Sequence, residues 1–335
     1  MLSDNTRKYF EQPDLWNREI YEYQKQVLND ILDILPEDIT SILDVGCGDG
    51  LITNALPEKL NVVGLDISKE ALNYVNRPKI KASITDIPFP DNSFDIVMAN
   101  DVIEHLSSSD RELALSEIAR VANRYVIITV PFMEDLNIAT TKCQDCGEFY
   151  HLNHHFASFD IPALNSLLNT KGYQCSKQIL TGDTWNTELP EAVLLKRLLG
   201  LEYPASDDAV CPNCGSGKTE VPKENEQLTM EIDKITTNKH CVNQDDLYLL
   251  RTECISIYVK NKSPKLPSEY GPGFIDLQGS AVDLQSKEIF NNIIDFTSAE
   301  IYHKDFLPQM AFLPYFIGGK INAGNVEVAE NQSIK

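Results

Sequence analysis

Apolar runs and segments with helical spacing alternate regularly between Thr40 and Val130. Five short runs are predicted to be strands, and their largely apolar character is typical of strands buried on both faces. These runs are residues 41–46, 61–66, 79–87, 94–100 and 125–131. Between them, one helix is predicted to begin at Ser68 and another at Ser109, with Glu112 completing a capping box. The alternation predicts a parallel sheet with helices on both faces.

The flanking segments add further elements to this α/β region. Residues 15–35 have the spacing of an amphipathic helix, which Pro36 is expected to end. A helix near residues 161–171 precedes two further predicted strands, residues 173–180 and 248–260. These two strands would join the same sheet.

The composition is that of an ordinary globular protein, with 42% hydrophobic and 24% charged residues. The formal net charge of -21 repels phosphate backbones and no dense Lys/Arg cluster is present, so free nucleic acid is an unfavourable partner. Because the N-terminus has no apolar leader and no run approaches about 18 apolar residues, we expect a cytoplasmic protein. In that reducing compartment the cysteines are expected to be free thiols or metal ligands.

A glycine-rich turn, LDVGCGDG at residues 43–50, follows the first predicted strand. Gly46, Gly48 and Gly50 would let the backbone turn sharply and approach a ligand closely. Asp66 ends the second strand, where a carboxylate can accept hydrogen bonds from both hydroxyls of a ribose. Because Leu51 stands where a dinucleotide fingerprint requires glycine, the pattern predicts a nucleoside site of another kind.

The segments ILDVGCGDG, VVGLDIS and ITDIPFPDNSFDIVMANDVIEHL are similar to the successive motifs of class I S-adenosylmethionine-dependent methyltransferases. The similarity is greatest to small-molecule enzymes with a P-F-x-D-x-S-F-D signature, here residues 88–95. It implies a Rossmann-like sheet of seven strands, whose last strand, RTECISIYVK, is antiparallel. It also implies S-adenosylmethionine as cofactor and an in-line SN2 methyl transfer to an oxygen, nitrogen or carbon atom.

The same resemblance implies which residues contact the cofactor. These are Asp44, Gly46, Gly48 and Gly50 at its methionine part, Asp66 at the ribose hydroxyls, Ile67, Asp86 and Ile87 at the adenine, and Asn100 and Asp101 beneath the sulfonium end. Asp86 and Asn100 could instead serve only as turn residues.

Two C-x-x-C-G motifs lie outside these segments, and each has the form of a zinc knuckle, a tight turn that presents two thiolates to one tetrahedral ion. Together they predict a closed structural zinc site, close to the acceptor pocket, with the ligands Cys143, Cys146, Cys211 and Cys214. Two alternatives stay open. One is two unlinked thiol pairs or a thioredoxin-like redox site, and the other is a local zinc site formed by Cys143, Cys146, His151 and either His154 or His155.

Three histidines are candidates for a catalytic base. His105 lies just past the fourth predicted strand, and His154 and His155 open a segment, HHFASFD, that resembles the active-site approach to a helix in these enzymes. Packing or capping is the alternative role of each. In addition, Asp101, Glu104 and His105 with a later histidine resemble the metal site of small-RNA 2'-O-methyltransferases, although those enzymes have glutamate where this chain has Asp101.

We therefore expect residues 1–262 to form an S-adenosylmethionine-dependent methyltransferase domain and residues 263–335 to form a C-terminal extension, whose role is unknown and where a protein partner could dock. The expected parts of the domain are an N-terminal lid helix (9–35), a core (40–131) and zinc-knuckle insertions around 141–155 and 186–246. The expected acceptor is a small molecule, a sugar or glycan, or a natural-product intermediate. The alternatives are a metal-dependent RNA 2'-O-methyltransferase and a non-catalytic, cofactor-binding interaction module.

Overall fold

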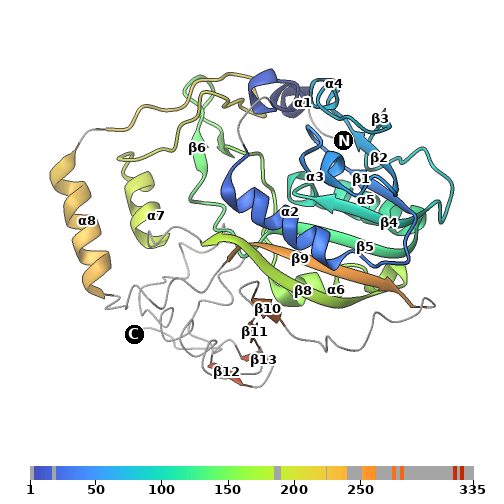
Figure 1. Ribbon diagram of the computed structural model, residues 1–335. Coiled ribbons are helices and arrows are strands. Elements are labelled where there is room, and N and C mark those ends of the chain that lie inside the picture. Colours follow the sequence, from blue (N-terminus) through green and yellow to red (C-terminus); the bar gives the residue numbers. More distant parts are fainter. Residues whose placement is uncertain are drawn as a thin grey trace.

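The computed structural model describes residues 4–16, 20–184, 190–223, 225–239 and 251–261, with the backbone of four short strands between 274 and 327 (Figure 1). Among these residues, no helix has the length and apolar character needed to cross a membrane. The remainder of the predicted extension from 263 to 335 lies outside the described residues.

A single large sheet is the centre of the fold, in the order β11-β10-β8-β9-β5-β4-β1-β2-β3. Its strands are β1 (Ser41–Val45), β2 (Asn61–Asp66), β3 (Lys79–Lys81), β4 (Phe94–Asn100), β5 (Ala122–Pro131), β8 (Tyr173–Thr184), β9 (Arg251–Lys260), β10 (Phe274–Asp276) and β11 (Ser280–Val282). Strands β1 to β5 pair in parallel, whereas β9 is antiparallel to both β5 and β8. The predicted seven-stranded, Rossmann-like sheet with its antiparallel strand is therefore confirmed, and β10 and β11 extend its β8 edge.

Helices cover both faces of this sheet (Figure 1). They are α2 (Glu22–Ile34), α3 (Leu51–Ala55), α4 (Lys69–Leu72), α5 (Ser108–Val121) and α6 (Ile161–Ser166), with 3-10 turns η2 (Ile103–His105) and η3 (Asn169–Lys171). Because successive strand residues point to opposite faces, Ile96 shares one core cluster with Ile31 of α2, and Val97 shares another with Ile118 of α5. The two hydrophobic layers hold the sheet's carboxyl edge in place.

The N-terminal region differs from the single predicted helix over residues 9–35. Two helical elements, α1 (Asp4–Phe10) and η1 (Pro13–Leu15), precede α2. Pro13 begins the 3-10 turn, and Gln24 Oε1 accepts the backbone N–H of Tyr21, so α2 begins at Glu22. We call residues 4–16 the lid segment, because they lie across the carboxyl edge of the sheet (Figure 1).

Two other predicted boundaries are wrong. The N-cap of helix α5 lies two residues earlier than predicted, because Ser107, not Ser109, accepts the N–H of Asp110. The strand predicted over 79–87 is confined to β3, after which Asp86 N–H bonds to Ser83 O in a turn. The second difference changes which residues follow β3 at the carboxyl edge of the sheet.

The predicted insertions form a separate layer at the carboxyl end of the sheet (Figure 1). A small hairpin of β6 (Thr140–Lys142) and β7 (Phe149–His151) carries the first cysteine pair. The second insertion contributes α7 (Pro190–Leu198) and α8 (Glu226–Lys239), which contact each other. Strands β12 (Lys320–Asn322) and β13 (Asn325–Glu327) form a further antiparallel pair.

Candidate active site and cysteine cluster

A cavity of about 660 Å³ lies between the carboxyl ends of the sheet strands and the lid segment. Its lining joins the glycine turn and Asp66 at one end to Asp101, Glu104 and His105 at the other. Open α/β sheets bind their ligands at this edge because the loops that follow the strands diverge there. The cavity is therefore the candidate active site.

The glycine turn forms the floor of the cavity. The N–H groups of Gly46 and Cys47 both donate to Leu65 O, at 2.6 and 3.0 Å, which ties the turn to β2. Gly46 and Gly48 have positive φ angles of 70° and 53°. A Cβ atom on Gly48 would lie 2.9 Å from the Trp16 ring, so only glycine lets this lid residue rest on the turn.

Asp66 lies at the end of β2 and is buried beside the turn. Its Oδ2 accepts the N–H of Gly48 at 2.9 Å, and its Oδ1 accepts the N–H of Ser68 at 2.7 Å. Burial raises the pKa of the carboxyl above its ordinary value, although these backbone hydrogen bonds favour the charged form. Both Asp66 and the adjacent Ile67 line the cavity, as the resemblance implies.

A second polar group joins three strands at the same edge. Asp44 accepts the hydroxyl of Thr53 at 2.6 Å and the amide of Asn100 at 3.3 Å, and Asn100 in turn accepts the hydroxyl of Thr129 at 2.9 Å. Burial raises the pKa of Asp44 to about 6. This network fixes the ends of β1, β4 and β5 relative to each other.

Three of the residues assigned to the cofactor do not line the cavity. Gly50 caps α3 in a left-handed conformation, a turn role rather than a lining one. Asp86 and Ile87 are also outside the lining, and the N–H of Ile87 is bonded to Glu117. The chain leaves the cavity earlier than expected because β3 is short. The lining residues there are Ala82, Ser83, Ile84 and Thr85.

The far end of the cavity is lined by acidic residues and histidines. Asp101 has a positive φ of 52°, an uncommon conformation for a residue other than glycine. It begins the short turn that brings Glu104 and His105 to the cavity. The other members are Glu134, which follows β5, and Glu253, which is paired with Pro131 in β9.

Glu134 orients two histidines. Its Oε2 lies 2.6 Å from Nδ1 of His155, and its Oε1 lies 3.3 Å from Nε2 of His151. Burial would raise the pKa of Glu134, but the hydrogen bonds from His151 and His155 outweigh it and lower the pKa to about 2. The two histidine rings stack with their centroids 4.6 Å apart, and the His105 ring meets His155 edge-on at 4.6 Å.

Glu104 is the most constrained acid of this group. Its side chain is 0% exposed, and neither carboxylate oxygen has a hydrogen-bond partner. Burial, and then repulsion from Asp101, raise its pKa well above the ordinary value for glutamate. The segment that carries His155 is joined to it through the main chain, since Phe156 N–H donates to Glu104 O at 2.7 Å.

Of the three histidine candidates for a base, the structure brings His105 and His155 to the cavity but not His154. The Nε2 atom of His154 lies 2.8 Å from Val210 O, and its ring stacks on Tyr9 of α1 with centroids 4.4 Å apart. Burial lowers the pKa of His154 to about 4. His154 therefore joins the lid segment to the second insertion, a packing role.

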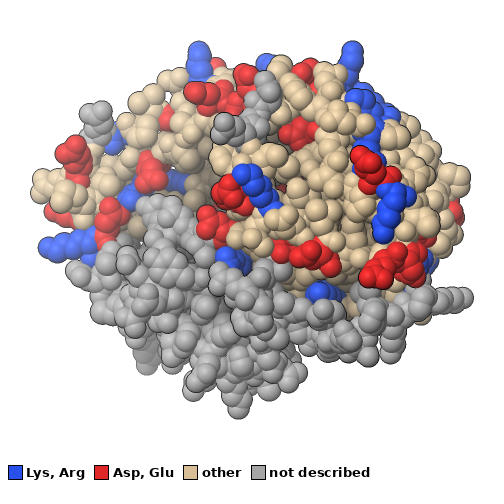
Figure 2. Space-filling model, in the orientation of Figure 1, with Lys and Arg blue, Asp and Glu red and all other residues tan. Residues whose placement is uncertain are grey.

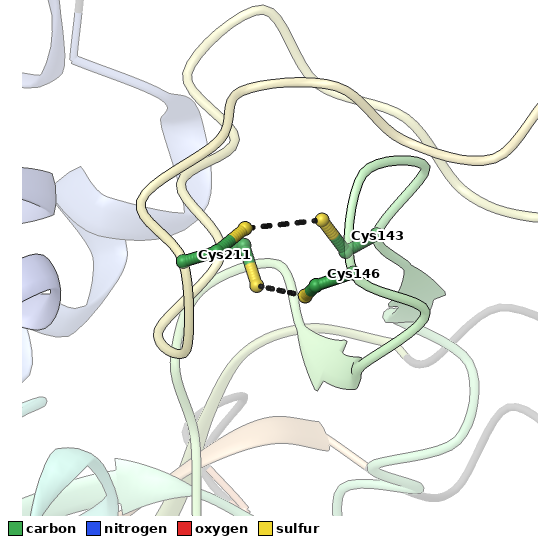
Figure 3. Close-up of side chains that lie close together, drawn as sticks. Cys143, Cys146 and Cys211 are labelled. Carbon is green, nitrogen blue, oxygen red and sulfur yellow. Dashed lines mark hydrogen bonds between the residues drawn. The ribbon is translucent and has the colours of Figure 1, made fainter.

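The four cysteines of the two C-x-x-C-G motifs converge at one point (Figure 3). The Sγ atoms of Cys143 and Cys214 are 3.6 Å apart, as are those of Cys146 and Cys211. This spacing is too long for a disulfide and close to the roughly 3.8 Å that four thiolates adopt around one tetrahedral zinc. Neither His154 nor His155 belongs to this group, so the local site of mixed ligands is not formed.

The two cysteine turns have the same backbone design. In the first thiol loop, residues 143–147, Gly147 N–H donates to Cys143 O at 2.9 Å, and in the second, residues 211–215, Gly215 N–H donates to Cys211 O at 2.8 Å. Both glycines have positive φ, of 77° and 75°. A bridge between Cys143 and Thr219 joins the loops, so the sulfur cluster is supported by the main chain.

The second thiol loop also contacts the lid segment. Asn5 Nδ2 donates to the carbonyls of Pro212 and Asn213, at 3.3 and 3.0 Å. Gln12 Nε2 donates to Asp208 O at 2.9 Å. At the end of α1, the Phe10 carbonyl accepts the Trp16 indole N–H at 2.8 Å, and Trp16 rests on Gly48, so the lid segment connects the cysteine cluster to the glycine turn.

Sequence reasoning missed Glu134 and Glu253 as cavity residues. Both acids lie outside the recognised motifs: Glu134 follows β5, and Glu253 lies within β9. They meet only because β5 and β9 pair antiparallel, with Pro131 opposite Glu253. An acid at the carboxyl end of a buried strand was the one signal that could have indicated Glu134.

Comparison with known proteins finds similarity to methyltransferases in both sequence and structure. Residues 43–128 match a family described as "Methyltransferase domain". An uncharacterized protein of Methanocaldococcus jannaschii is 33% identical over 179 residues, 48% of this chain and 76% of that protein. A malonyl-(acyl-carrier protein) O-methyltransferase of Legionella pneumophila is 29% identical over 133 residues, 36% of this chain and 46% of that protein.

Among solved structures, a SAM-dependent methyltransferase from Archaeoglobus fulgidus is similar at 15% identity and a TM-score of 0.44. The similarity covers 76% of this chain and 97% of that one.

Proposed function

Since the chain belongs to the class I S-adenosylmethionine-dependent methyltransferases, we propose that it methylates a hydroxyl group of a small molecule, a sugar or glycan, or a natural product. One observation carries this proposal. A single cavity joins the glycine turn and Asp66 to an end lined by acids and histidines. The first part suits the cofactor, and the second suits an acceptor that must lose a proton.

The cofactor would lie along the glycine turn. Gly46 and Gly48 would let its methionine part approach the backbone, and Asp66 would accept hydrogen bonds from the ribose hydroxyls. Ile67 and Ile84 provide apolar lining for the adenine. Asn100 and Asp101, at the end of β4, would then face the sulfonium group.

The acceptor would enter from the side of Glu104, Glu134 and His155. S-adenosylmethionine supplies the electrophilic methyl group and its own leaving group when it is bound. The residues of this chain would align the acceptor oxygen with the methyl–sulfur bond and exclude water from that position. They must also handle the hydroxyl proton, and His105 and His155 are the histidines of the cavity positioned to do so.

We further propose a structural zinc ion held by Cys143, Cys146, Cys211 and Cys214. Four thiolates leave no open coordination position, so the ion would stabilise the fold rather than bind the acceptor. The second thiol loop contacts Asn5, and the adjoining Asp208 contacts Gln12, so this ion would influence the lid segment.

An RNA acceptor is less favoured than a small molecule. The net charge of -21 opposes a polyanion, and Figure 2 shows Lys and Arg side chains scattered among Asp and Glu on the visible described surface. A non-catalytic module is also less favoured, because a binding role alone does not require the buried acids and histidines beside the cofactor end.

The test is a transfer assay that follows formation of S-adenosylhomocysteine with panels of hydroxyl, amine and carbon acceptors. We expect turnover with hydroxyl acceptors and a strong decrease in Asp66→Asn, which keeps the side-chain shape and removes the charge. Removal of a charged hydrogen bond costs about 1.5–3 kcal/mol, or roughly 10- to 150-fold in affinity. Cofactor binding without turnover on any panel would support the non-catalytic module.

A further inference from the structure

We propose that the acceptor is an uncharged oligosaccharide, and that a second cavity binds the sugar unit next to the one that is methylated. This second cavity, which we call the side cavity, has a volume of about 270 Å³. It adjoins the larger cavity of the candidate active site, because Tyr23 and Asp183 line both. The role given to the side cavity rests on the proposed methyl transfer, whereas the site itself rests on the geometry of its walls.

The side cavity lies next to the acceptor end of the larger cavity. Arg251 lines the side cavity, and Thr252 and Glu253, the next two residues of β9, line the larger one. Glu253 belongs to the acidic end at which the acceptor is proposed to enter. Two residues of a strand advance about 7 Å, which is a suitable separation for two linked rings of one acceptor.

A β-bulge forms the wall between the two cavities. The pairing of β8 with β9 is regular up to Thr181 and shifts its register before Thr184. Within the bulge Gly182 has a positive φ of 80°, and a Cβ atom there would clash with Thr252 Oγ1. That hydroxyl oxygen also accepts the N–H of Asp183 at 3.0 Å. Bulges commonly redirect a side chain beside an active site, and this one holds Asp183 at the junction of the cavities.

Hydrogen bonds fix the opposite wall, helix α2, to the same strand. The hydroxyl of Thr181 donates to Asp30 Oδ2 at 2.6 Å, and Gln26 Nε2 donates to both carboxylate oxygens of Asp30 at 3.1 Å. Across the cavity, Arg251 Nη1 donates to Gly182 O at 3.3 Å. The walls are therefore held in place before a ligand arrives, so binding does not require them to be ordered.

An exposed aromatic pair stands at the mouth of both cavities. The Tyr23 ring is 37% exposed and stacks on the ring of Tyr21, which is 53% exposed, with centroids 5.8 Å apart and an interplanar angle of 13°. A sugar ring presents C–H groups on its faces and hydroxyls at its edges, so a face can pack on an aromatic ring. Tyrosine offers such a contact at a low cost in side-chain entropy. The pair is therefore suited to carry the face of a sugar.

The other groups around the side cavity indicate an uncharged, hydroxyl-rich ligand. Apart from Tyr23 and the backbone of Gly182, the described lining consists of polar side chains, those of Glu22, Gln26, Thr181, Asp183 and Arg251. An apolar ligand would leave these groups without hydrogen bonds, whereas sugar hydroxyls both donate and accept. Two carboxylates against one guanidinium also disfavour a phosphorylated or sulfated glycan. The volume is slightly below the roughly 300 Å³ at which ligand pockets begin, so the side cavity suits a single ring.

The experiment measures saccharide binding by saturation-transfer NMR to the full chain with saturating S-adenosylhomocysteine. The ligands are the methyl glycosides of glucose, galactose, mannose and rhamnose, and uncharged disaccharides built from them. We expect at least one disaccharide to bind about tenfold or more tightly than its own units, because the side cavity adds contacts that one ring does not reach. The ratio of the two Kd values is the readout, since a general loss of folding weakens both ligands alike.

Four variants locate the effect. Tyr23→Ala should lower the ratio about tenfold, because the ring contact and its buried area are lost, whereas Tyr23→Phe keeps the ring and should change the ratio less than about twofold. Asp183→Asn should lower it about tenfold or more, as expected for a charged hydrogen bond. Leu113→Ala is the control, because it removes an exposed apolar side chain of α5 that lines neither cavity. It should leave the ratio unchanged.

Three results would overturn the proposal. They are no binding of any saccharide of the panel at millimolar concentration, equal affinity for disaccharides and their units, and a ratio that neither Tyr23→Ala nor Asp183→Asn changes. Failure of the proposed function is distinguishable from these. Methyl transfer to acceptors other than sugars, without saccharide binding, contradicts the side cavity and leaves the methyl transfer intact. A disaccharide that binds through Tyr23 and Asp183 but is not methylated supports the side cavity and contradicts the proposed function.

Discussion

Loss of the proposed zinc ion should weaken cofactor binding, although none of its four cysteine ligands lines the cavity. The substitution Cys211→Ser removes one of four ligands and frees the second thiol loop. That loop receives two hydrogen bonds from Asn5, while Gln12 bonds to the adjoining Asp208 and Val210 packs on Tyr9. Without these contacts, α1 is a seven-residue helix, far shorter than helices that are stable alone.

The size of the expected loss in cofactor affinity follows from the contacts of the lid segment at the cavity. Trp16 rests on Gly48, and Glu11 accepts the backbone N–H groups of Lys69 and Glu70 at the start of α4. Three lost hydrogen bonds contribute about 0.5–1.5 kcal/mol each, and the exposed ones fall at the low end. If about 1–3 kcal/mol is required to order the lid again, the affinity for S-adenosylhomocysteine falls about 5- to 150-fold.

The assay combines elemental analysis with calorimetry. Wild-type protein should contain one zinc per chain, and Cys211→Ser should lose it together with cofactor affinity. Cys175→Ser is the control, since Cys175 lies in β8 outside the cluster and should leave both quantities unchanged. Zinc loss with unchanged affinity would refute the connection through the lid. Retention of zinc in Cys211→Ser would refute the four-cysteine site itself.

Three further predictions concern single side chains. Trp16→Ala should weaken S-adenosylhomocysteine binding about tenfold in calorimetry, because the ring closes the cavity over Gly48; unchanged affinity would show that the lid does not contact the cofactor. Burial raises the pKa of Asp44 from 3.8 to about 6, so between these pH values the folded state binds more protons than the unfolded state. The contribution of Asp44 to the free energy of unfolding therefore falls as the pH rises from about 4 to 6. At about 1.4 kcal/mol per pKa unit, the loss in free energy of unfolding is about 3 kcal/mol. Asp44→Asn should therefore flatten the pH dependence of stability in urea unfolding between pH 4 and 6, and an unchanged pH dependence would contradict the raised pKa of Asp44. His154→Gln should lower the melting temperature, because the ring stack with Tyr9 is lost, and should change kcat by no more than a few-fold at saturating cofactor. A decrease in kcat of about 100-fold or more would contradict the packing role and indicate that His154 is catalytic.

The sheet could be predicted because its signals are local. The central strands β1, β2, β4 and β5 have apolar runs, and β9 could be placed because the resemblance implies an antiparallel last strand, which RTECISIYVK supplies. The cysteine cluster was predictable for a similar reason. A C-x-x-C-G turn has one conformation suited to presenting two thiolates, and two such turns in one chain favour a shared ion.

The errors occur where the position of a residue depends on distant contacts. The resemblance implies that Asp86 and Ile87 contact the adenine, but β3 ends at Lys81 and the residues there that line the cavity are 82–85. His154 and His155 are adjacent in sequence and indistinguishable by pattern. The positive φ of His154, 57°, turns its ring toward Tyr9, whereas His155 meets Glu134.

The most direct test of the account is a calorimetric titration of the wild-type chain with S-adenosylhomocysteine. It predicts one site per chain with a Kd at or below about 100 μM, which corresponds to roughly -5.5 kcal/mol, and a loss of at least about tenfold in Asp66→Asn. No heat of binding at millimolar ligand, from protein shown to be folded and zinc-loaded, would contradict the central claim.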